Sequence, residues 1–342
     1  MLPTEQRIPF DRFSGCLLGQ CLGDALGHPV EGFPPYECLD YLHQHVRPLW
    51  NGKGSTQTSR IGQYTDDSQL ARELLESIVA CGNFDPDDYA RRLVSLFTTN
   101  RVVGKGLACD AAVRRLAGGV SWEEAGEPAP SAGNGTAMRA APVGMMYHTR
   151  PTEMIRVAKE QGWITHRDIR CDAGSVAVAA AVALALQGEN RPVEFVNGVA
   201  RHVMPIDTSL GELITQLPAM LEKDIRDVAD WASRAGIEPG YPNGWPGISP
   251  FVVGTVLWSM YCFLKTPDDY FASVWEAIAV GGDADTTAAI TGAISGAYNG
   301  TTALPQHLLG MLHDHGTWRQ NDLQKLCSEA YQKYLRDGLY GK

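Results

Sequence analysis

The sequence predicts an all-α fold, a compact orthogonal bundle of many helices, and three observations support this prediction. Apolar residues recur at helical spacing over most of the chain, as in Leu70, Leu74 and Ile78. Gly82 stands where that helix would end. Alternating runs that would build a sheet are nearly absent, and no loop is long or biased enough to be a linker between domains. We therefore expect a single domain over residues 1–342.

The same periodicity marks further elements in chain order. Helices are predicted over residues 87–97, 109–119, 172–188, 209–236, 249–265, 269–280 and 322–339. The intervening loops that are richest in Pro and Gly cover residues 27–36, 51–67, 126–144 and 236–250. Because functional residues concentrate on loops held by a rigid scaffold, we expect the chemistry on these loops.

Composition excludes several classes of function. The chain of 342 residues is 44% hydrophobic and carries 29 Lys plus Arg against 39 Asp plus Glu, a formal charge of -10. No candidate helix has a basic stripe, so no nucleic-acid partner is expected. The N-terminal stretch has no apolar core of a signal peptide, and the small-apolar run 176–186 is shorter than the roughly 20 residues of a membrane span. We expect a soluble, cytoplasmic protein with no membrane partner, and favour a monomer.

The cysteines are expected to be reduced thiols of the core. They are scattered along a long chain and form no CxxC pair that would indicate zinc or a redox site. Their positions are 16, 21, 38, 81, 109, 171, 262 and 327.

A first acidic cluster, "TDD", stands at the start of a predicted helix. Thr65 is suited to cap this helix, and Asp66 and Asp67 in the first turn would complement the helix dipole by about 0.3–1 kcal/mol each. Capping alone would account for these residues. A role as metal ligands is the alternative.

A second acidic cluster, "DADTT", is harder to explain as a surface turn. Behind it, Ala288, Gly292, Gly296 and Gly300 recur every fourth residue and form a helix face without side chains. Glycine inside a helix costs roughly 0.8–1.0 kcal/mol relative to alanine, so this face predicts close approach of another backbone. The helix start would then be buried, and its carboxylates would need a cation.

Oxygen ligands indicate a hard ion, Mg²⁺, Mn²⁺ or Ca²⁺. An EF-hand is excluded, because Ala288 and Ile294 stand where its loop requires Gly and Glu. The cluster also fits the DxDxT nucleophile motif of haloacid-dehalogenase-type phosphatases. That interpretation requires a parallel sheet, whereas the residues that follow are predicted to be helical.

An ordered set of motifs resembles the ADP-ribosylglycohydrolase family, whose founding type removes ADP-ribose from an arginine of dinitrogenase reductase. The motifs are "GCLLGQCLGDALGHPVEGF", "YTDDSQLA", "AGNGTAMRAAPVG", "THRDIRCDAG" and "GGDADTTAAITGAISGAYNG". They run in family order over residues 12–311. The resemblance implies an all-α fold with a binuclear site between helix ends that holds two Mg²⁺ or Mn²⁺ ions.

The resemblance also implies roles for individual residues. The metal ligands it implies are Thr65, Asp66, Asp67, Asp283, Asp285 and Thr286. The catalytic residues it implies are Glu31, Asp66, Asp67 and Asp285, with Glu31 as the acid/base or gating group. The chemistry is attack of an oriented water at the anomeric carbon of the ribose. Asp24 is expected to orient a ligand or water, and Thr287 has no assigned role.

On sequence alone the Gly-Asn-Gly loop is a turn, although glycines can turn successive N–H groups toward an anion. The resemblance implies that this loop cradles the diphosphate and ribose. The residues expected to bind substrate are Gly133, Asn134, Gly135, Thr136, Met138 and His166. Arg139 is left outside the site as a candidate for a structural ion pair. Tyr241 and Trp245 could stack on adenine or simply fold their loop.

One departure from the family pattern concerns the acceptor. Where relatives that act on arginine place an acidic residue to face the guanidinium, this chain has Val102, with Lys105 and Asp110 nearby. Ser68 stands where Thr is common and keeps the hydroxyl. The sequence therefore predicts a hydrolase that removes ADP-ribose from a protein side chain, arginine or serine. The alternatives are a hydrolase of O-acetyl-ADP-ribose or another small ADP-ribose conjugate, and a protein that binds ADP-ribose without catalysis.

Overall fold

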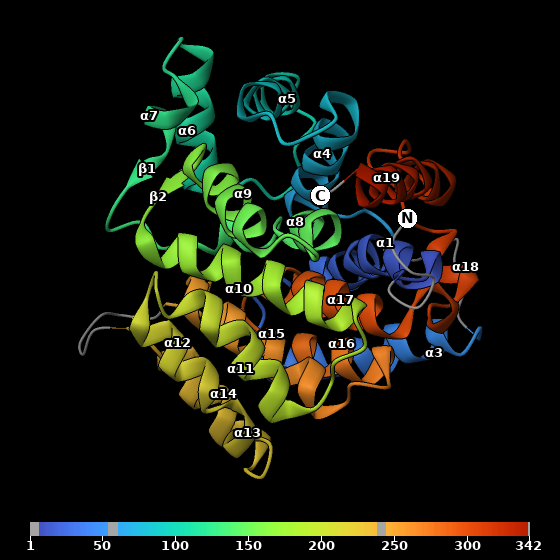
Figure 1. The fold of residues 1–342 in the computed structure, drawn as a ribbon. Coiled ribbons are helices and arrows are strands. Elements are labelled where there is room, and N and C mark those ends of the chain that lie inside the picture. Colours follow the sequence, from blue (N-terminus) through green and yellow to red (C-terminus); the bar gives the residue numbers. More distant parts are fainter. Residues whose placement is uncertain (1–6, 54–60, 238–243, 341–342) are drawn as a thin grey trace.

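The computed structural model describes residues 7–53, 61–237 and 244–340, and these residues fold almost entirely into helices (Figure 1). The first α-helices are α1 (Phe10–Gly27), α2 (Pro35–Tyr41), α3 (Arg47–Trp50), α4 (Asp66–Cys81), α5 (Pro86–Thr98), α6 (Leu107–Ala117), α7 (Trp122–Ala125), α8 (Ala141–Tyr147) and α9 (Pro151–Trp163). The later ones are α10 (Ile169–Leu186), α11 (Pro192–Val203), α12 (Thr208–Thr215), α13 (Leu217–Met220), α14 (Ile225–Arg234), α15 (Val252–Lys265), α16 (Tyr270–Ala279), α17 (Ala284–Asn299), α18 (Gln306–Leu309) and α19 (Gln320–Tyr340).

Short elements complete the described chain. They are the 3₁₀ helices η2 (His28–Val30), η4 (Asn134–Thr136) and η5 (Thr301–Ala303), the π-helix η3 (Leu42–Val46), and the strands β1 (Glu127–Pro128) and β2 (His166–Arg167). The two strands pair in parallel over two residues each. The predicted all-α class is confirmed, and the parallel sheet that the phosphatase interpretation requires has no counterpart beyond this pair in the described residues.

One predicted helix is wrong in extent. The segment 209–236 forms three helices, α12, α13 and α14, rather than one. Pro218 stands in the first turn of α13. A proline is tolerated at the start of a helix but not in its interior, so a new helix begins here. The Asp224 side chain accepts a hydrogen bond from the Arg226 N–H and begins α14. These two local signals override the apolar periodicity that runs across the breaks.

The small-residue face of α17 packs directly on α1, as the close-approach prediction required. The two helices run antiparallel, and a Cβ on Gly19 of α1 would clash with the Gly292 carbonyl oxygen of α17. The same relation joins Gly15 to Gly296 and Gly23 to Ala288. Gly300 continues this contact at the end of the helix, because a Cβ on Gly15 would come within 2.8 Å of the Gly300 Cα. With φ of 80° it is the C-cap of α17, a backbone conformation that favours glycine.

Helix α10 lies at the centre of the fold, packed between α8 and α9 on one side and α11 and α17 on the other (Figure 1). Among the helices that can be described, α10 alone is long and apolar enough to cross a membrane. However, 83% of it is buried inside the protein, which is how a core helix packs. The eight cysteines are all free thiols, and Cys81 is exposed, so the prediction of core thiols is wrong for this one position.

Candidate active site

Four aspartates from opposite ends of the chain meet between the starts of α4 and α17. Asp66 and Asp67 lie in the first turn of α4, Asp285 lies in the first turn of α17, and Asp283 immediately precedes α17. Each is only 3–4% exposed. Asp283 and Thr286 are among the groups that shift the pKa of Asp67, so the two predicted clusters form one group.

The start of α4 is held by a buried carboxylate. The Thr65 side chain accepts a hydrogen bond from the Asp67 N–H at 3.3 Å, so the predicted cap exists. Asp24, on α1 and fully buried, accepts hydrogen bonds from the N–H and hydroxyl groups of both Thr65 and Ser68. Capping and a site role are therefore compatible, and Asp24 orients the first turn of α4.

The start of α17 depends on two glycines with positive φ, Gly281 at 72° and Gly282 at 80°. A Cβ on Gly282 would clash with the carbonyl oxygen of Ile248, and the Asp283 N–H donates to that same oxygen at 2.7 Å. The Thr287 hydroxyl donates to the carbonyls of Asp283 and Ala277. Thr287 thus stabilises the start of α17 through backbone carbonyls, and its hydroxyl is not bonded to the carboxylates of the site.

The electrostatics of the four aspartates favour a cation. Burial raises the pKa of Asp66, Asp67 and Asp285, and the neighbouring carboxylates raise it further. Within the described chain, no Lys or Arg nitrogen forms an ion pair with any of the four. Among the described residues, the buried Asp67 Oδ1 has no hydrogen-bond partner. Buried, mutually repelling oxygen donors with an unsatisfied atom fit a divalent metal ion, so the predicted ligand residues are suited to hold one.

Glu31 stands at the edge of this group. Burial, followed by the nearby Asp283, raises the pKa of Glu31, while a hydrogen bond with Asp285 opposes the rise. The structure also places His28 here, a residue that sequence reasoning missed. Its Nδ1 is 3.9 Å from Asp285 Oδ2. A signal existed in the sequence, because His28 precedes Glu31 by three residues, and such residues lie on the same side of a 3₁₀ helix.

The Gly-Asn-Gly loop connects to the aspartates through one side chain. Asn134 Nδ2 donates to Asp283 Oδ2 and, at 3.0 Å, to Thr255 Oγ1. The loop backbone is held by a hydrogen bond from the Asn134 N–H to the Pro250 carbonyl. The amide predicted to bind substrate is therefore already engaged in orienting Asp283.

The other side chains predicted to bind substrate lie inside the protein. The Thr136 hydroxyl donates to the Cys171 carbonyl, and the Met138 carbonyl accepts from Gln20 Nε2. His166 is 2% exposed, and its ring lies against Gly133 and Gly135, where a Cβ on either would meet it. Burial, followed by the charge of Arg139, lowers the pKa of His166 to about 3, so the ring is neutral. Of the two glycines of this loop, Gly133 is partly exposed and Gly135 is buried.

The expectations for Arg139 and for the aromatic residues Tyr241 and Trp245 have different outcomes. Arg139 is fully buried and donates to Gln161 and Thr165, two uncharged residues. In the described residues it pairs with no carboxylate, so the expected ion pair is wrong although the structural role is correct. Tyr241 lies outside the described residues, and the Trp245 ring approaches Gly32, beside Glu31.

The loop from Val102 to Gly106 lies on Asp66. The Asp66 N–H donates to the Val103 carbonyl at 2.8 Å, and the Gly106 backbone hydrogen bonds to the Asp66 carboxylate. Asp110, the nearby carboxylate considered for an arginine acceptor, is paired with Lys105 at 2.9 Å and with Arg114 at 2.7 Å. It is therefore already neutralised.

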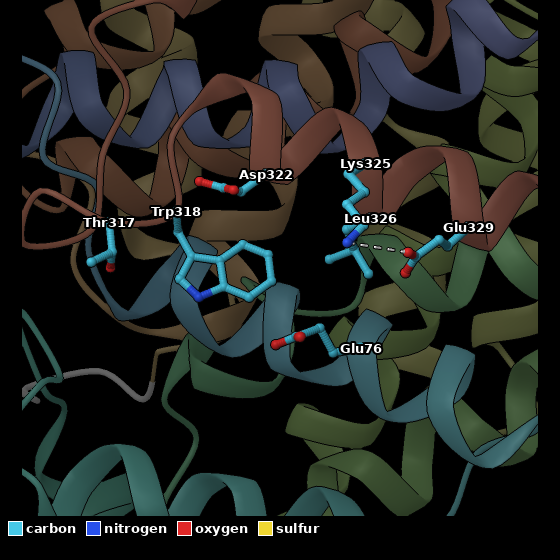
Figure 2. Close-up of a pocket in the computed structure, with 7 residues that line it drawn as sticks. All are labelled: Glu76, Thr317, Trp318, Asp322, Lys325, Leu326 and Glu329. Atoms are coloured by element: carbon cyan, nitrogen blue, oxygen red, sulfur yellow. Dashed lines mark ion pairs between the residues drawn. The ribbon is translucent and has the colours of Figure 1, made fainter.

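Two cavities formed by described residues lie away from the aspartates. One of about 510 Å³ lies between α4 and α19 and is lined by Glu76, Trp318 and Lys325, among others (Figure 2). Glu76 is ten residues beyond Asp66 on α4, about 15 Å along the helix axis. None of the predicted site residues lines this cavity.

An all-α scaffold that buries uncompensated carboxylates at its helix ends defines a class of helical hydrolases. The family model for ADP-ribosylglycohydrolase matches residues 5–338, and the chain belongs to this family. Human ADP-ribosylhydrolase ARH3 is 30% identical over 322 residues, covering 86% of this chain and 87% of its own. ADP-ribosylarginine hydrolase Tri1 of Pseudomonas putida is 26% identical, covering 100% of this chain and 84% of its own.

A solved structure supports the same assignment. An ADP-ribosylglycohydrolase-related protein complex superimposes with a TM-score of 0.69 and 26% identity, covering 95% of this chain and 98% of that one. The chain is therefore a hydrolase that acts on glycosyl bonds of ADP-ribose. The phosphatase interpretation is wrong.

Proposed function

We propose that this protein is a divalent-metal-dependent ADP-ribosylhydrolase that releases ADP-ribose from a modified protein side chain by attack of water at the anomeric carbon. The observation that supports the proposal is the buried group of four aspartates, with Asp67 Oδ1 lacking a hydrogen-bond partner. Buried carboxylates without a cation are costly to a fold, so a fold that retains them has a use for them.

The ligand set we propose is that implied by the family motifs. Its residues are Thr65, Asp66, Asp67, Asp283, Asp285 and Thr286, which would hold two Mg²⁺ or Mn²⁺ ions. When bound, divalent cations at this position would supply Lewis acidity toward the attacking water. Asp24 and Asn134 keep the ligands in place from each side through the hydrogen bonds described above.

Glu31 is the residue we propose to move the proton. It is partly exposed, and it lies close to Asp283 and Asp285. Its raised pKa suits a group that accepts a proton from water and returns it to the leaving group. The backbone of Gly133 and Gly135 would bind the diphosphate, with neutral His166 supporting the loop from below.

The surroundings of Asp66 favour a serine-linked substrate over an arginine-linked one. A guanidinium leaving group would be stabilised by a carboxylate near the ribose. The loop on Asp66 carries Val102 and Lys105 instead, and Asp110 is already paired with two cations. A serine hydroxyl is neutral and needs no such partner.

A substrate panel tests the proposal. Serine-linked, arginine-linked and acetyl-linked ADP-ribose are incubated with the protein in Mg²⁺, in Mn²⁺ and with chelator, and free ADP-ribose is measured. We expect release from the serine conjugate that stops with chelator and in Asp66→Asn, but continues in Asp40→Asn, a variant of an exposed aspartate. Release unaffected by chelator would refute the metal mechanism. Release from the acetyl conjugate alone would make a small conjugate the substrate, and tight binding of ADP-ribose without turnover would indicate a non-catalytic protein.

A further inference from the structure

His28 brings a nitrogen donor to a group that otherwise consists of oxygen donors. It is the first residue of η2, directly after the C-terminal end of α1. Its Nδ1 is 3.9 Å from Asp285 Oδ2, and ligand atoms of His28, Glu31 and Asp285 all lie within 4.8 Å of one another. The three side chains come from α17 and from the turn after α1, the same two elements that the glycine face holds together.

Among the described residues, His28 Nδ1 has no hydrogen-bond partner. The Nδ1 atom itself has almost no solvent-accessible surface, yet it makes no hydrogen bond to the described residues. A buried imidazole nitrogen usually donates or accepts one hydrogen bond, and leaving it unsatisfied is unfavourable. Asp67 Oδ1, 3% exposed, is unsatisfied in the same group. The site thus contains an unsatisfied nitrogen and an unsatisfied oxygen, both of which are suited to bind a metal ion.

The separation of the donor atoms suits one metal ion. Metal–nitrogen and metal–oxygen bonds of first-row ions are about 2.1 Å, so two ligands of one ion are at most about 4.2 Å apart. The distance of 3.9 Å between His28 Nδ1 and Asp285 Oδ2 is within this limit. Imidazole is a good ligand for transition-metal ions, whereas Mg²⁺ prefers oxygen ligands in strict octahedral geometry.

We propose that His28 is a metal ligand of this site, together with Asp285, and that its nitrogen makes this position select Mn²⁺ over Mg²⁺. The inference rests on the proposed metal-dependent function and adds to it a ligand and an ion preference. The carboxylates alone could bind either Mg²⁺ or Mn²⁺, and the nitrogen ligand of His28 would raise the affinity for Mn²⁺ relative to Mg²⁺.

Pulsed EPR of the full-length protein loaded with Mn²⁺ tests this directly, without an activity assay. Coordination by imidazole produces ¹⁴N modulation of the Mn²⁺ signal. We expect this modulation in the wild-type protein and in His202→Gln, a half-buried histidine on α11, and expect it to be lost in His28→Gln. In competition experiments, the Mg²⁺ concentration that displaces half of the Mn²⁺ should fall about 10-fold in His28→Gln and stay unchanged in His202→Gln.

The possible failures are distinguishable. Bound Mn²⁺ without ¹⁴N modulation in the wild-type protein, or modulation that persists in His28→Gln, would overturn the role of His28. Chelator-sensitive release of ADP-ribose would then still support the proposed function. If no Mn²⁺ binds at all and chelator has no effect on release, both proposals fail. The wild-type spectrum is decisive even if the variant does not fold, which circular dichroism would reveal.

Discussion

The buried aspartates of this protein have two opposite kinds of neighbours, cationic or polar partners in one case and other carboxylates in the other. Asp314, in the loop before α19, is fully buried and accepts hydrogen bonds from Arg72 Nη1 at 2.8 Å and Gln69 Nε2 at 2.7 Å. Asp67 and Asp285 are about as deeply buried, but they face other carboxylates, and Asp67 Oδ1 has no partner. Helix α4 supplies both arrangements, with Asp67 in its first turn and Arg72 about one turn later.

The difference separates stability from function. An aspartate paired with a buried arginine has its charge compensated inside the chain, so removing it leaves the arginine uncompensated. An aspartate among like charges has its compensation outside the chain, so removing its charge relieves repulsion in the metal-free protein. Burial alone does not tell the two apart, whereas the identity of the neighbours does.

The largest effect is expected from Asp285→Asn. Loss of a ligand charge should lower the rate of ADP-ribose release by at least about 100-fold, judged from the loss of comparable charge-stabilising groups. The free energy of unfolding in chelator should be unchanged or higher, because one of several repelling charges is gone. Rates and urea unfolding of Asp285→Asn and of the exposed-site control Asp40→Asn would be compared. Strong destabilisation without metal would contradict the distinction.

Asp314→Asn should behave in the opposite way. In this variant Arg72 keeps its ion pair with Glu73 at 2.8 Å but loses its ion pair with the fully buried Asp314 carboxylate. We therefore expect the free energy of unfolding to fall by about 3 kcal/mol. Activity per folded molecule should stay close to that of the wild type. Urea unfolding and an assay corrected for the folded fraction would measure both quantities. A stable but inactive variant would move Asp314 into the functional set.

Metal addition should stabilise the protein by binding to the aspartates that face other carboxylates, Asp67 and Asp285 among them. An ion that binds only the folded state at 100 times its dissociation constant adds about 2.7 kcal/mol to the free energy of unfolding. We expect Mn²⁺ to raise the melting temperature of the wild-type protein and of Asp314→Asn, and to raise that of Asp285→Asn much less. Equal shifts in all three proteins would place the bound ion elsewhere.

The smallest effect concerns Glu76, a carboxylate with mixed neighbours at the cavity of Figure 2. Burial, followed by Glu73, raises the pKa of Glu76 from 4.5 to about 7. The folded protein therefore binds this proton more tightly than the unfolded chain, and stability falls as pH rises from 4.5 to 7. Glu76→Gln removes this dependence.

Relative to the wild type, Glu76→Gln should therefore be more stable at pH 8 than at pH 5, by on the order of 1 kcal/mol after solvent screening. Thermal melts of both proteins at the two pH values would measure the difference. An identical difference at the two pH values would contradict the raised pKa.

Much of the fold and part of the site could be predicted from local signals. Thr65 caps α4 and Gly82 ends it in the left-handed conformation, as expected. The prediction failed where local and periodic signals compete, as in the three helices of 209–236, and it did not foresee the partners of some side chains. Asn134 was assigned to substrate but is bonded to Asp283, and His28 was not noticed, because contacts of this kind depend on how helices pack.

The sequence by itself determined the helical class, the caps and the chemical types of the donors, because these depend on residues within a turn or two of one another. Only the tertiary structure decided which donors meet. Asp67 and Asp285 are over 200 residues apart in the chain and are brought together by the fold. For Asp285, the close approach of Gly15, Gly19 and Gly23 to the bare face of α17 sets the position, since any larger side chain there would push the helix away.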